Sequence, residues 1–406
     1  MKIFISGICG TGMGPLALIA HSAGIEVVGS DLAEGAVFSE LTTAGIPVHI
    51  GSQDGNFLRT HLSTVDWFIY TSALAPNHPE LLLARQASLK ISKRDEFINF
   101  LIQKFQLKLI AIAGTHGKTT TTSMIIFTAV KFNLPVSYLV GTTLPQLPSG
   151  IYHSGDRYLV YEADEYDRNF LHFHPWLAVI PTISYDHSNI YPTLQSYQSA
   201  FVKFKQQSQQ VLENPTVDSR LTLVGPARRL NATLAKQAIL KIEPTLSELD
   251  VINVLNQFPG ANRRFERLAD GVYSDYAHHP KEISATLEMA EEEAKKYHKK
   301  GIIVIYQPHQ NIRQHQIFTQ YHDIFNKVTK LFWLPTFLTR EDPSLPLLSP
   351  EDFIHTLDHP SLATPANLNQ TLADQLKAYQ SAGYLIILMT AGPADSWFRR
   401  LFARNT

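Results

Sequence analysis

One segment of the chain, residues 114–120, has the residue types that bind the phosphates of a nucleotide. An apolar run precedes it at residues 109–113, and a stretch with helical spacing follows it as far as Phe132. A strand, a glycine turn and a helix N-terminus direct several backbone N–H groups at one point, which suits an anion. The Lys118 ammonium can reach the β- and γ-phosphates, and the Thr119 hydroxyl can ligate Mg²⁺. The segment therefore predicts a nucleoside triphosphate site.

This segment differs from the usual phosphate-loop pattern at its first glycine, because Ile112 stands five residues before Gly117. The alternative interpretation is a tight strand-to-helix turn whose lysine is solvated. Glycine, lysine and threonine together in a strand–helix context favour nucleotide binding. The residues expected to contact the nucleotide are Gly114, Thr115, Gly117, Lys118, Thr119 and Thr120.

A second glycine cluster, residues 7–14, follows the first apolar strand of the chain. Asp31 ends the second strand, about 20 residues further on, where a dinucleotide-binding fold places its ribose-binding acid. Alone, this pattern suggests NAD and an oxidoreductase, and a purely structural turn is a further alternative. Because the glycine spacing is irregular and no hydride-transfer chemistry follows, a nucleotide diphosphate without nicotinamide fits better.

Carboxylates close an apolar strand downstream of the phosphate loop, at residues 162–167. At the end of a strand beside the loop, Glu162 can hold Mg²⁺. We expect His187 to end the next strand at the same sheet edge, where a neutral imidazole can bind a second divalent ion. A hydrogen-bonded structural histidine is the alternative for His187.

The last third of the chain carries guanidinium and imidazole groups after its expected strands, and these suit phosphate or carboxylate recognition. Taken singly, the histidines could be hinge or packing residues. As a set at strand ends, they suggest an active site that closes. The residues are Arg263, Arg264, His278, His279, His309 and Arg313.

Composition places the chain among ordinary globular proteins. Its 406 residues suggest two or three domains, with 44% hydrophobic and 17% charged residues. A net charge of −1 argues against a protein that coats nucleic acid or a membrane surface. The one cysteine, Cys9, excludes an intrachain disulfide. With no signal-peptide pattern and no apolar run long enough to span a bilayer, we expect a soluble, cytoplasmic protein.

Strands alternate with helices along most of the chain, which predicts α/β domains with parallel sheets. We expect domain boundaries near residues 106 and 258, giving domains 1–106, 107–258 and 259–406. In the middle domain, we predict a helix over 194–212, a short strand over 221–224, and two helical stretches that end at Phe258. A charged helix over 282–300 has the pattern of a solvated face.

In this order, the motifs resemble the Mur ligases of bacterial peptidoglycan synthesis, on the branch that includes the alanine-adding and murein-tripeptide ligases. The resemblance covers nearly the whole chain. It is carried by residues 7–14, 28–31, 71–73, 114–121, 162–167, 186–187, 263–266, 275–280 and 307–309.

This resemblance implies three α/β domains: an N-terminal Rossmann-like UDP-binding domain, a shortened central P-loop ATPase-type domain and a C-terminal Rossmann-like domain. It implies UDP-sugar contacts at Gly10, Gly12, Met13, Asp31 and Ser72, and further ATP contacts at Asn231 and Arg264. The implied metal ligands are Thr119, Glu162 and His187, and the implied catalytic residues are Lys118, Glu162, His187, His278 and Arg313.

The activity implied by the resemblance is ATP- and Mg²⁺-dependent amide-bond formation. The carboxylate of UDP-N-acetylmuramate would be phosphorylated and then attacked by the amine of L-alanine or of a short murein peptide. No nucleic-acid partner and no membrane insertion are expected, and the protein would be a monomer or a homodimer.

Two departures from the family pattern motivate an alternative, and a third weakens the case for L-alanine as the incoming amine. Ala227 and Arg228 replace a His-Asn pair, the stretch between residues 212 and 221 is short, and Gln310 stands where the alanine-adding enzymes commonly carry arginine. The alternative is a non-catalytic relative that binds a UDP-sugar without ATP turnover.

Overall fold

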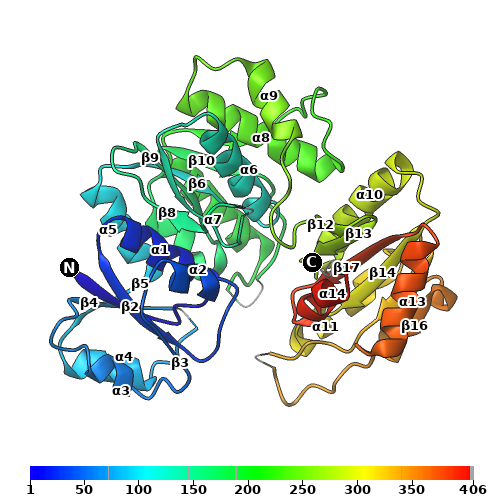
Figure 1. Cartoon of the computed structure of the whole chain (residues 1–406), viewed down its shortest axis with the longest axis horizontal. Coiled ribbons are helices and arrows are strands. Elements are labelled where there is room, and N and C mark those ends of the chain that lie inside the picture. Colours follow the sequence, from blue (N-terminus) through cyan, green and yellow to red (C-terminus); the bar gives the residue numbers. More distant parts are fainter. Residues whose placement is uncertain (72, 145, 188–189, 340, 403–406) are drawn as a thin grey trace. The chain divides into compact units, whose positions relative to one another are not determined.

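The computed structural model describes residues 1–71, 73–144, 146–187, 190–339 and 341–402. These residues form three sheets (Figure 1). By contacts the chain divides into two compact units, Met1–Leu221 with Leu230–Phe258, and Thr222–Arg229 with Pro259–Thr406. The predicted α/β class is confirmed, and the boundaries at residues 106 and 258 remain predictions.

The first sheet is parallel and has the order β3-β2-β1-β4-β5. Because side chains alternate along a strand, Phe4 packs with the helices on one face and Ile3 and Ile5 pack with those on the other. The strands are β1 (Lys2–Ser6), β2 (Glu26–Asp31), β3 (Val48–Ile50), β4 (Trp67–Tyr70) and β5 (Lys90–Lys93). The helices are α1 (Gly14–Ser22), α2 (Phe38–Thr43), α3 (Asn56–Arg59), α4 (Pro79–Gln86) and α5 (Arg94–Lys104).

The second sheet has the order β11-β10-β6-β9-β7-β8, and β8 alone pairs antiparallel with its neighbour. Strand β6 lies between β9 and β10, so the loops that follow these three strands meet at one edge. The strands are β6 (Lys108–Ile112), β7 (Val136–Leu139), β8 (Gly150–Ile151), β9 (Tyr158–Glu162), β10 (Leu177–Ile180) and β11 (Val211–Glu213). The helices are α6 (Lys118–Lys131), the 3₁₀ helix η1 (Tyr166–His172), α7 (Leu194–Gln206), α8 (Pro226–Ile242) and α9 (Glu248–Asn256).

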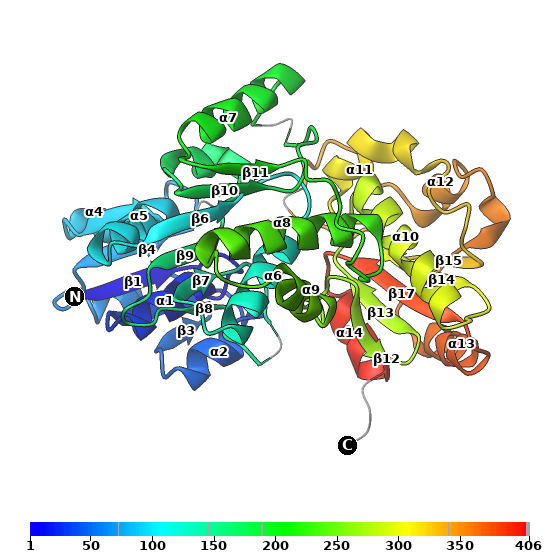
Figure 2. The same cartoon turned by 90° about the horizontal axis from the view of Figure 1, so that it is seen from above.

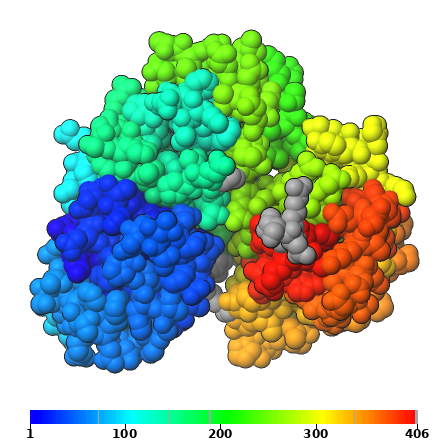
Figure 3. Space-filling model, viewed as in Figure 1, coloured from blue at the N-terminus to red at the C-terminus, as the bar shows by residue number. Residues whose placement is uncertain are grey.

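These first two sheets belong to the same compact unit and share one hydrophobic core. The residues of this core come from positions between Ile3 and Phe204. Polar contacts join them as well. The Glu40 carboxylate accepts hydrogen bonds from the backbone N (2.6 Å) and the hydroxyl (3.0 Å) of Ser149. In the space-filling view, dark blue residues of the first region adjoin green-blue residues of the second (Figure 3).

The third sheet forms the core of the second unit, with the order β12-β13-β17-β14-β15-β16. Only β12 and β13 pair antiparallel. Ile303 and Ile305 pack with α13 and α14 on one face, and Val304 and Tyr306 pack on the face of α10 (Figure 2). The strands are β12 (Glu266–Ala269), β13 (Val272–Asp275), β14 (Ile302–Gln307), β15 (Lys330–Trp333), β16 (Ala363–Pro365) and β17 (Leu385–Thr390). The helices are α10 (Pro280–Lys296), α11 (Asn311–Ile317), η2 (Phe318–Tyr321), α12 (Pro350–Ile354), η3 (Pro360–Leu362), α13 (Gln370–Ser381) and α14 (Ala394–Phe402).

Two expected elements are wrong. The helix predicted over 194–212 ends at Gln206, because the chain turns to add β11 beside β10, where Val211 pairs with Ala178. Residues 221–224 form no strand, although Leu221 and Leu223 are buried. Alternate residues of this segment are therefore buried although the segment forms no strand. The charged helix also ends early, at Lys296. Among the described helices, none combines the length and the hydropathy required to cross a membrane.

Candidate active site

The phosphate loop joins β6 to α6 through two glycines with left-handed backbone. Gly114 has φ +152° and Gly117, which precedes α6, has φ +86°. A Cβ at Gly114 would lie 2.7 Å from the carbonyl oxygen of Thr182, and one at Gly117 would lie 2.7 Å from Oδ1 of Asn231. Both positions therefore need glycine for conformation and for space. The same geometry places the predicted residue Asn231 directly beside the loop.

Lys118 begins α6, and its ammonium lies inside the loop. Its Nζ donates to the carbonyl of Gly114 and to Oε2 of Glu165, both at 2.6 Å. Burial acts to lower the pKa of Lys118, but the nearby carboxylates of Glu165, Asp164 and Glu162 together outweigh it and the pKa is raised. The ammonium is thus held positive at the position where the sequence predicts phosphate.

Glu165 is a site residue that the sequence did not reveal. Its side chain is 1% exposed and contacts both Lys118 and His187, whose Nε2 lies 3.3 Å from Oε1. Burial raises the pKa of Glu165, but Lys118 and His187 more than reverse this, so the carboxyl pKa is lowered. The Tyr191 hydroxyl also donates to the backbone carbonyl of Glu165 at 2.6 Å. The run of acidic residues was the only sequence signal for this role.

His187 lies near the loop, but not where we expected it. Strand β10 ends at Ile180, and His187 is in the connection beyond it with φ +57°. Burial lowers the pKa of His187, whereas its contact with Glu165 raises it, and the net shift is upward. Its described partner is therefore a carboxylate, and its role as a metal ligand remains a prediction.

Glu162 and Thr119 meet at the loop, as the strand order requires. The Thr119 hydroxyl donates to Oε1 of Glu162 at 2.9 Å. The other carboxylate oxygen, Oε2, is buried and has no hydrogen-bond partner among the described residues. An unsatisfied buried carboxylate oxygen beside a hydroxyl is a donor set that suits Mg²⁺. No group of three or more His, Cys, Asp or Glu side chains suited to a metal occurs in the described ranges.

The remaining loop residues support its shape. The Thr115 hydroxyl contacts the carbonyl of Ser184 and the hydroxyl of Tyr197, both at 2.7 Å, so it braces the loop. Thr120 lies in the first turn of α6. Their contacts with a nucleotide remain predictions.

The N-terminal glycine cluster forms a compact turn between β1 and α1. Gly10 N donates to the carbonyl of Gly7 at 3.1 Å, and Met13 N donates to the carbonyl of Gly10 at 3.0 Å. Asp31 closes the turn, because its Oδ2 accepts a hydrogen bond from Cys9 N at 2.8 Å. The predicted residue Ser72 lies outside the described residues. The cluster sits at the reversal of strand order in the first sheet, which is where such folds bind nucleotides.

The two predicted nucleotide sites lie side by side within the first unit. Gly141 follows β7, and a Cβ placed on it would lie 3.5 Å from Oε2 of Glu162 and 4.0 Å from the carbonyl oxygen of Thr11. Thr11 belongs to the glycine cluster, whereas Glu162 belongs to the phosphate-loop site. One residue therefore bridges the two.

In the second unit, the predicted arginines and histidines gather around Tyr276. The guanidinium carbons of Arg263 and Arg264 lie 4.7 and 4.9 Å from its ring centroid. The His278 ring lies 5.5 Å from Tyr276 and 5.7 Å from His309, centroid to centroid. These two arginines and two histidines therefore lie near one another, and an active site that closes remains a prediction.

His278 is partly buried, with 17% of its side chain exposed. Burial lowers the pKa of its imidazole, and the nearby charges of Arg313 and Arg264 lower it further, whereas Glu282 acts in the opposite direction. A neutral imidazole between cationic groups can accept a proton. This placement brings the predicted residues His278, Arg313 and Arg264 into one neighbourhood of the second unit.

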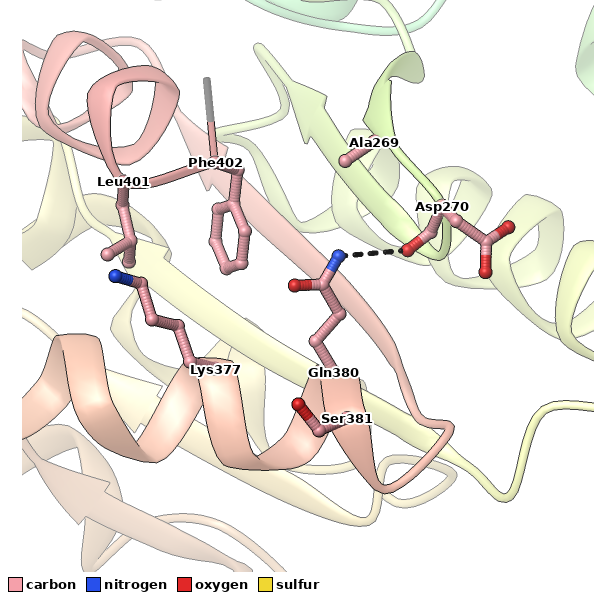
Figure 4. Close-up of a pocket in the computed structure, with 7 residues that line it drawn as sticks. All are labelled: Ala269, Asp270, Lys377, Gln380, Ser381, Leu401 and Phe402. Carbon is pink, nitrogen blue, oxygen red and sulfur yellow. Dashed lines mark hydrogen bonds between the residues drawn. The ribbon is translucent and has the colours of Figure 1, made fainter. Parts of the chain in front are cut away.

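A pocket elsewhere in the second unit holds none of the predicted site residues. It is lined by α13, the end of α14 and the turn between β12 and β13 (Figure 4). Gln380 Nε2 donates to the carbonyl of Asp270 at 3.2 Å across it. With one amine, Lys377, and mostly small or apolar neighbours, it has no grouping for the predicted chemistry.

Comparison with known proteins agrees with the motifs and the fold. The model described as the Mur ligase family, catalytic domain, matches residues 2–106, and that of the Mur ligase middle domain matches residues 112–214. The UDP-N-acetylmuramate–L-alanine ligase of Caldicellulosiruptor bescii is 30% identical, over 84% of this chain and 85% of the relative. That of Clostridium novyi is 31% identical, over 84% of both chains.

Solved structures agree on the three-domain α/β fold. The UDP-N-acetylmuramate–alanine ligase of Thermotoga maritima has a TM-score of 0.77 at 24% identity and covers 100% of this chain and 99% of its own. A murein peptide ligase of Psychrobacter arcticus has a TM-score of 0.64 at 21% identity, with 99% and 98% covered. With relatives of at least 30% identity along most of its length, the chain belongs to the Mur ligase family.

Proposed function

We propose that this protein is a cytoplasmic, ATP-dependent ligase that joins the carboxylate of UDP-N-acetylmuramate to the amine of L-alanine or of a short L-alanine-initiated murein peptide. One observation carries the proposal. Gly141, in the same compact unit as both sites, lies beside Glu162 of the phosphate-loop site and Thr11 of the glycine cluster. A phosphate donor and a UDP-sugar bound at these two places would be neighbours.

ATP is a substrate in this reaction, and the phosphate loop would hold it. Backbone N–H groups at the start of α6 and the Lys118 ammonium would neutralise charge on the transferred phosphoryl group. Mg²⁺, held by Thr119 and Glu162 and, as the sequence predicts, His187, would supply further positive charge. Asn231, beside Gly117, would contact the nucleotide.

The chemistry balances in two transfers. A carboxylate oxygen of the sugar forms a bond to the γ-phosphorus while the bond from that phosphorus to ADP breaks. The amine nitrogen then forms a bond to the acyl carbon, the bond from that carbon to phosphate breaks, and the amine loses a proton. Neither transfer needs a covalent protein nucleophile, so positioning and electrostatics supply most of the rate enhancement.

The incoming amine would be received by the second unit. His278, whose burial favours the neutral imidazole, is suited to accept the proton that the amine loses. Arg313, close enough to affect this imidazole, can hold a substrate carboxylate. Gln310 has φ +64° at the start of α11, immediately after His309.

The test is phosphate release with purified protein. We expect release only when ATP, Mg²⁺, UDP-N-acetylmuramate and an amine are all present, with L-alanine, other amino acids and murein tripeptide screened in parallel. Absence of release with every amine would contradict the proposal. UDP-sugar binding without detectable MgATP binding would favour the non-catalytic alternative, which Arg228 at the family's asparagine position motivates.

A further inference from the structure

Arg94, the first residue of α5, lies directly against the N-terminal glycine cluster. A Cβ built on Gly12 would fall 2.0 Å from Nη1 of Arg94 and 3.2 Å from its Cζ. A side chain at position 12 would have to displace the guanidinium, so the guanidinium lies against this part of the predicted UDP-sugar site.

The Arg94 guanidinium also lies near the end of β9. Its Cζ lies 5.9 Å from the ring centroid of Tyr161, the residue before Glu162. Tyr161 acts most strongly to raise the pKa of Arg94, burial opposes it, and Asp164 and Glu162 raise it further. The guanidinium is therefore near both the glycine cluster and the carboxylates of the phosphate-loop site.

Contacts of the neighbouring residues hold the start of α5 in place. Lys93 Nζ lies 3.0 Å from Oδ2 of Asp167, and Asp95 contacts the imidazole of His172. Both anchors attach the start of α5 to η1. In the described part of the chain, no hydrogen bond or ion pair of the Arg94 side chain is seen, so its five N–H donors are available to a ligand.

We propose that Arg94 binds the lactyl carboxylate of the UDP-sugar and holds it for transfer of the phosphoryl group, a role that rests on the proposed function. A guanidinium presents two parallel donors that match the two oxygens of a carboxylate. The carboxylate must lie between the uridine diphosphate anchor and the γ-phosphate. Arg94 is near both of the sites predicted to bind these groups. A uridine diphosphate sugar without the lactyl group would not use this contact.

The experiment compares two ligands by calorimetry, in the absence of ATP. UDP-N-acetylmuramate carries the lactyl carboxylate, and UDP-N-acetylglucosamine is the same nucleotide sugar without it. We expect Arg94→Ala to weaken the binding of UDP-N-acetylmuramate about 10- to 100-fold, the range for hydrogen bonds to a charged group. Binding of UDP-N-acetylglucosamine should be unchanged, which also verifies folding, and Arg94→Lys should restore part of the loss. Arg59→Ala, at an exposed arginine on α3, is the matched control.

Each outcome has one meaning. Equal weakening of both sugars would overturn the proposal and assign Arg94 to the diphosphate or to the fold, and unchanged binding of both would also overturn it. If the unaltered protein binds UDP-N-acetylmuramate no better than UDP-N-acetylglucosamine and releases no phosphate, the proposed function fails together with the role of Arg94. If it releases phosphate while Arg94→Ala retains the preference, only the role of Arg94 fails.

Discussion

At the residue scale, the centre of the site is the buried carboxylate of Glu165, shared by Lys118 and His187. Lys118, which is predicted to bind phosphate, is held here by the Glu165 carboxylate, with 2.6 Å between Nζ and Oε2. Such a contact keeps the ammonium charged and oriented despite its burial. Incoming phosphate oxygens would compete with Glu165 for the same donors, so the lysine is pre-positioned for its ligand.

Replacing Lys118 with alanine tests this centre. We expect ATP-dependent phosphate release to fall at least about 10²-fold, the loss typical when one preorganised charge on a transition state is removed. Affinity for UDP-N-acetylmuramate should persist, because the glycine cluster is untouched. Lys131→Ala, at the exposed end of the same helix, should leave turnover unchanged. If Lys118→Ala also loses sugar binding, the lysine is structural.

The Glu165–His187 contact predicts a pH-dependent stability. Because the folded-state pKa of His187 is raised, its stabilising effect is fully present below the unfolded pKa of about 6.5 and is lost as pH rises through the folded value. The stability advantage of the unaltered protein over His187→Gln should therefore be larger at pH 6 than at pH 9. Urea unfolding at both pH values measures it. An advantage that is constant, or that grows with pH, would contradict the contact.

At the element scale, the N-terminus of α6 depends on Gly117, where both the backbone conformation and the neighbouring atoms disfavour a side chain. Gly117→Ala would strain φ +86° and crowd Oδ1 of Asn231. We expect a loss of about 1–2 kcal/mol in the free energy of unfolding and a clear loss of ATP affinity. Gly155, with φ +92° and nothing within 4 Å of a built Cβ, is the control that carries strain alone. An equal effect of both variants on ATP affinity would argue against the loop geometry.

Most elements could be predicted because buried parallel strands are short apolar runs between helices. The apolar runs at residues 67–70 and 177–180 coincide with β4 and β10 residue for residue. The failures lie where pairing, not pattern, decides. Residues 211–213 become an edge strand only because β10 is there to receive them, and β3, β8 and β16, of two or three residues, are too short for a pattern.

The candidate site, like the fold, was predictable only in part. Lys118 and Thr119 begin the helix that follows β6, and Glu162 ends β9, so motif and strand order suffice to bring them together. Glu165 and Arg94 lie beside residues that are distant in sequence. Glu165 contacts Lys118, 47 positions away, and Arg94 lies beside Gly12. No spacing rule announces such a contact, because the fold creates it.

At the scale of the whole molecule, the N-terminal and central regions share one hydrophobic core. We expect the two regions to unfold together, and Glu40 is one of the residues that connect them. Glu40→Ala leaves the backbone N and hydroxyl of buried Ser149 without their acceptor, which costs about 1–3 kcal/mol.

Hydrogen exchange measures the consequence. Amides of both β1 and β6 should become less protected in Glu40→Ala, by the same free energy. Glu26→Ala, at a carboxylate with 76% of its side chain exposed, should change neither. Loss of protection confined to the first sheet would show that the two regions unfold independently.

The central claim is that this chain couples ATP cleavage to amide-bond formation on a UDP-sugar. The most direct measurement is phosphate release with ATP, Mg²⁺, UDP-N-acetylmuramate and L-alanine or murein tripeptide, with the product identified by its mass. The account predicts one phosphate and one new amide per ATP consumed, and no release when the UDP-sugar is omitted. Phosphate release that is indifferent to the UDP-sugar, or no release with any amine, would contradict it.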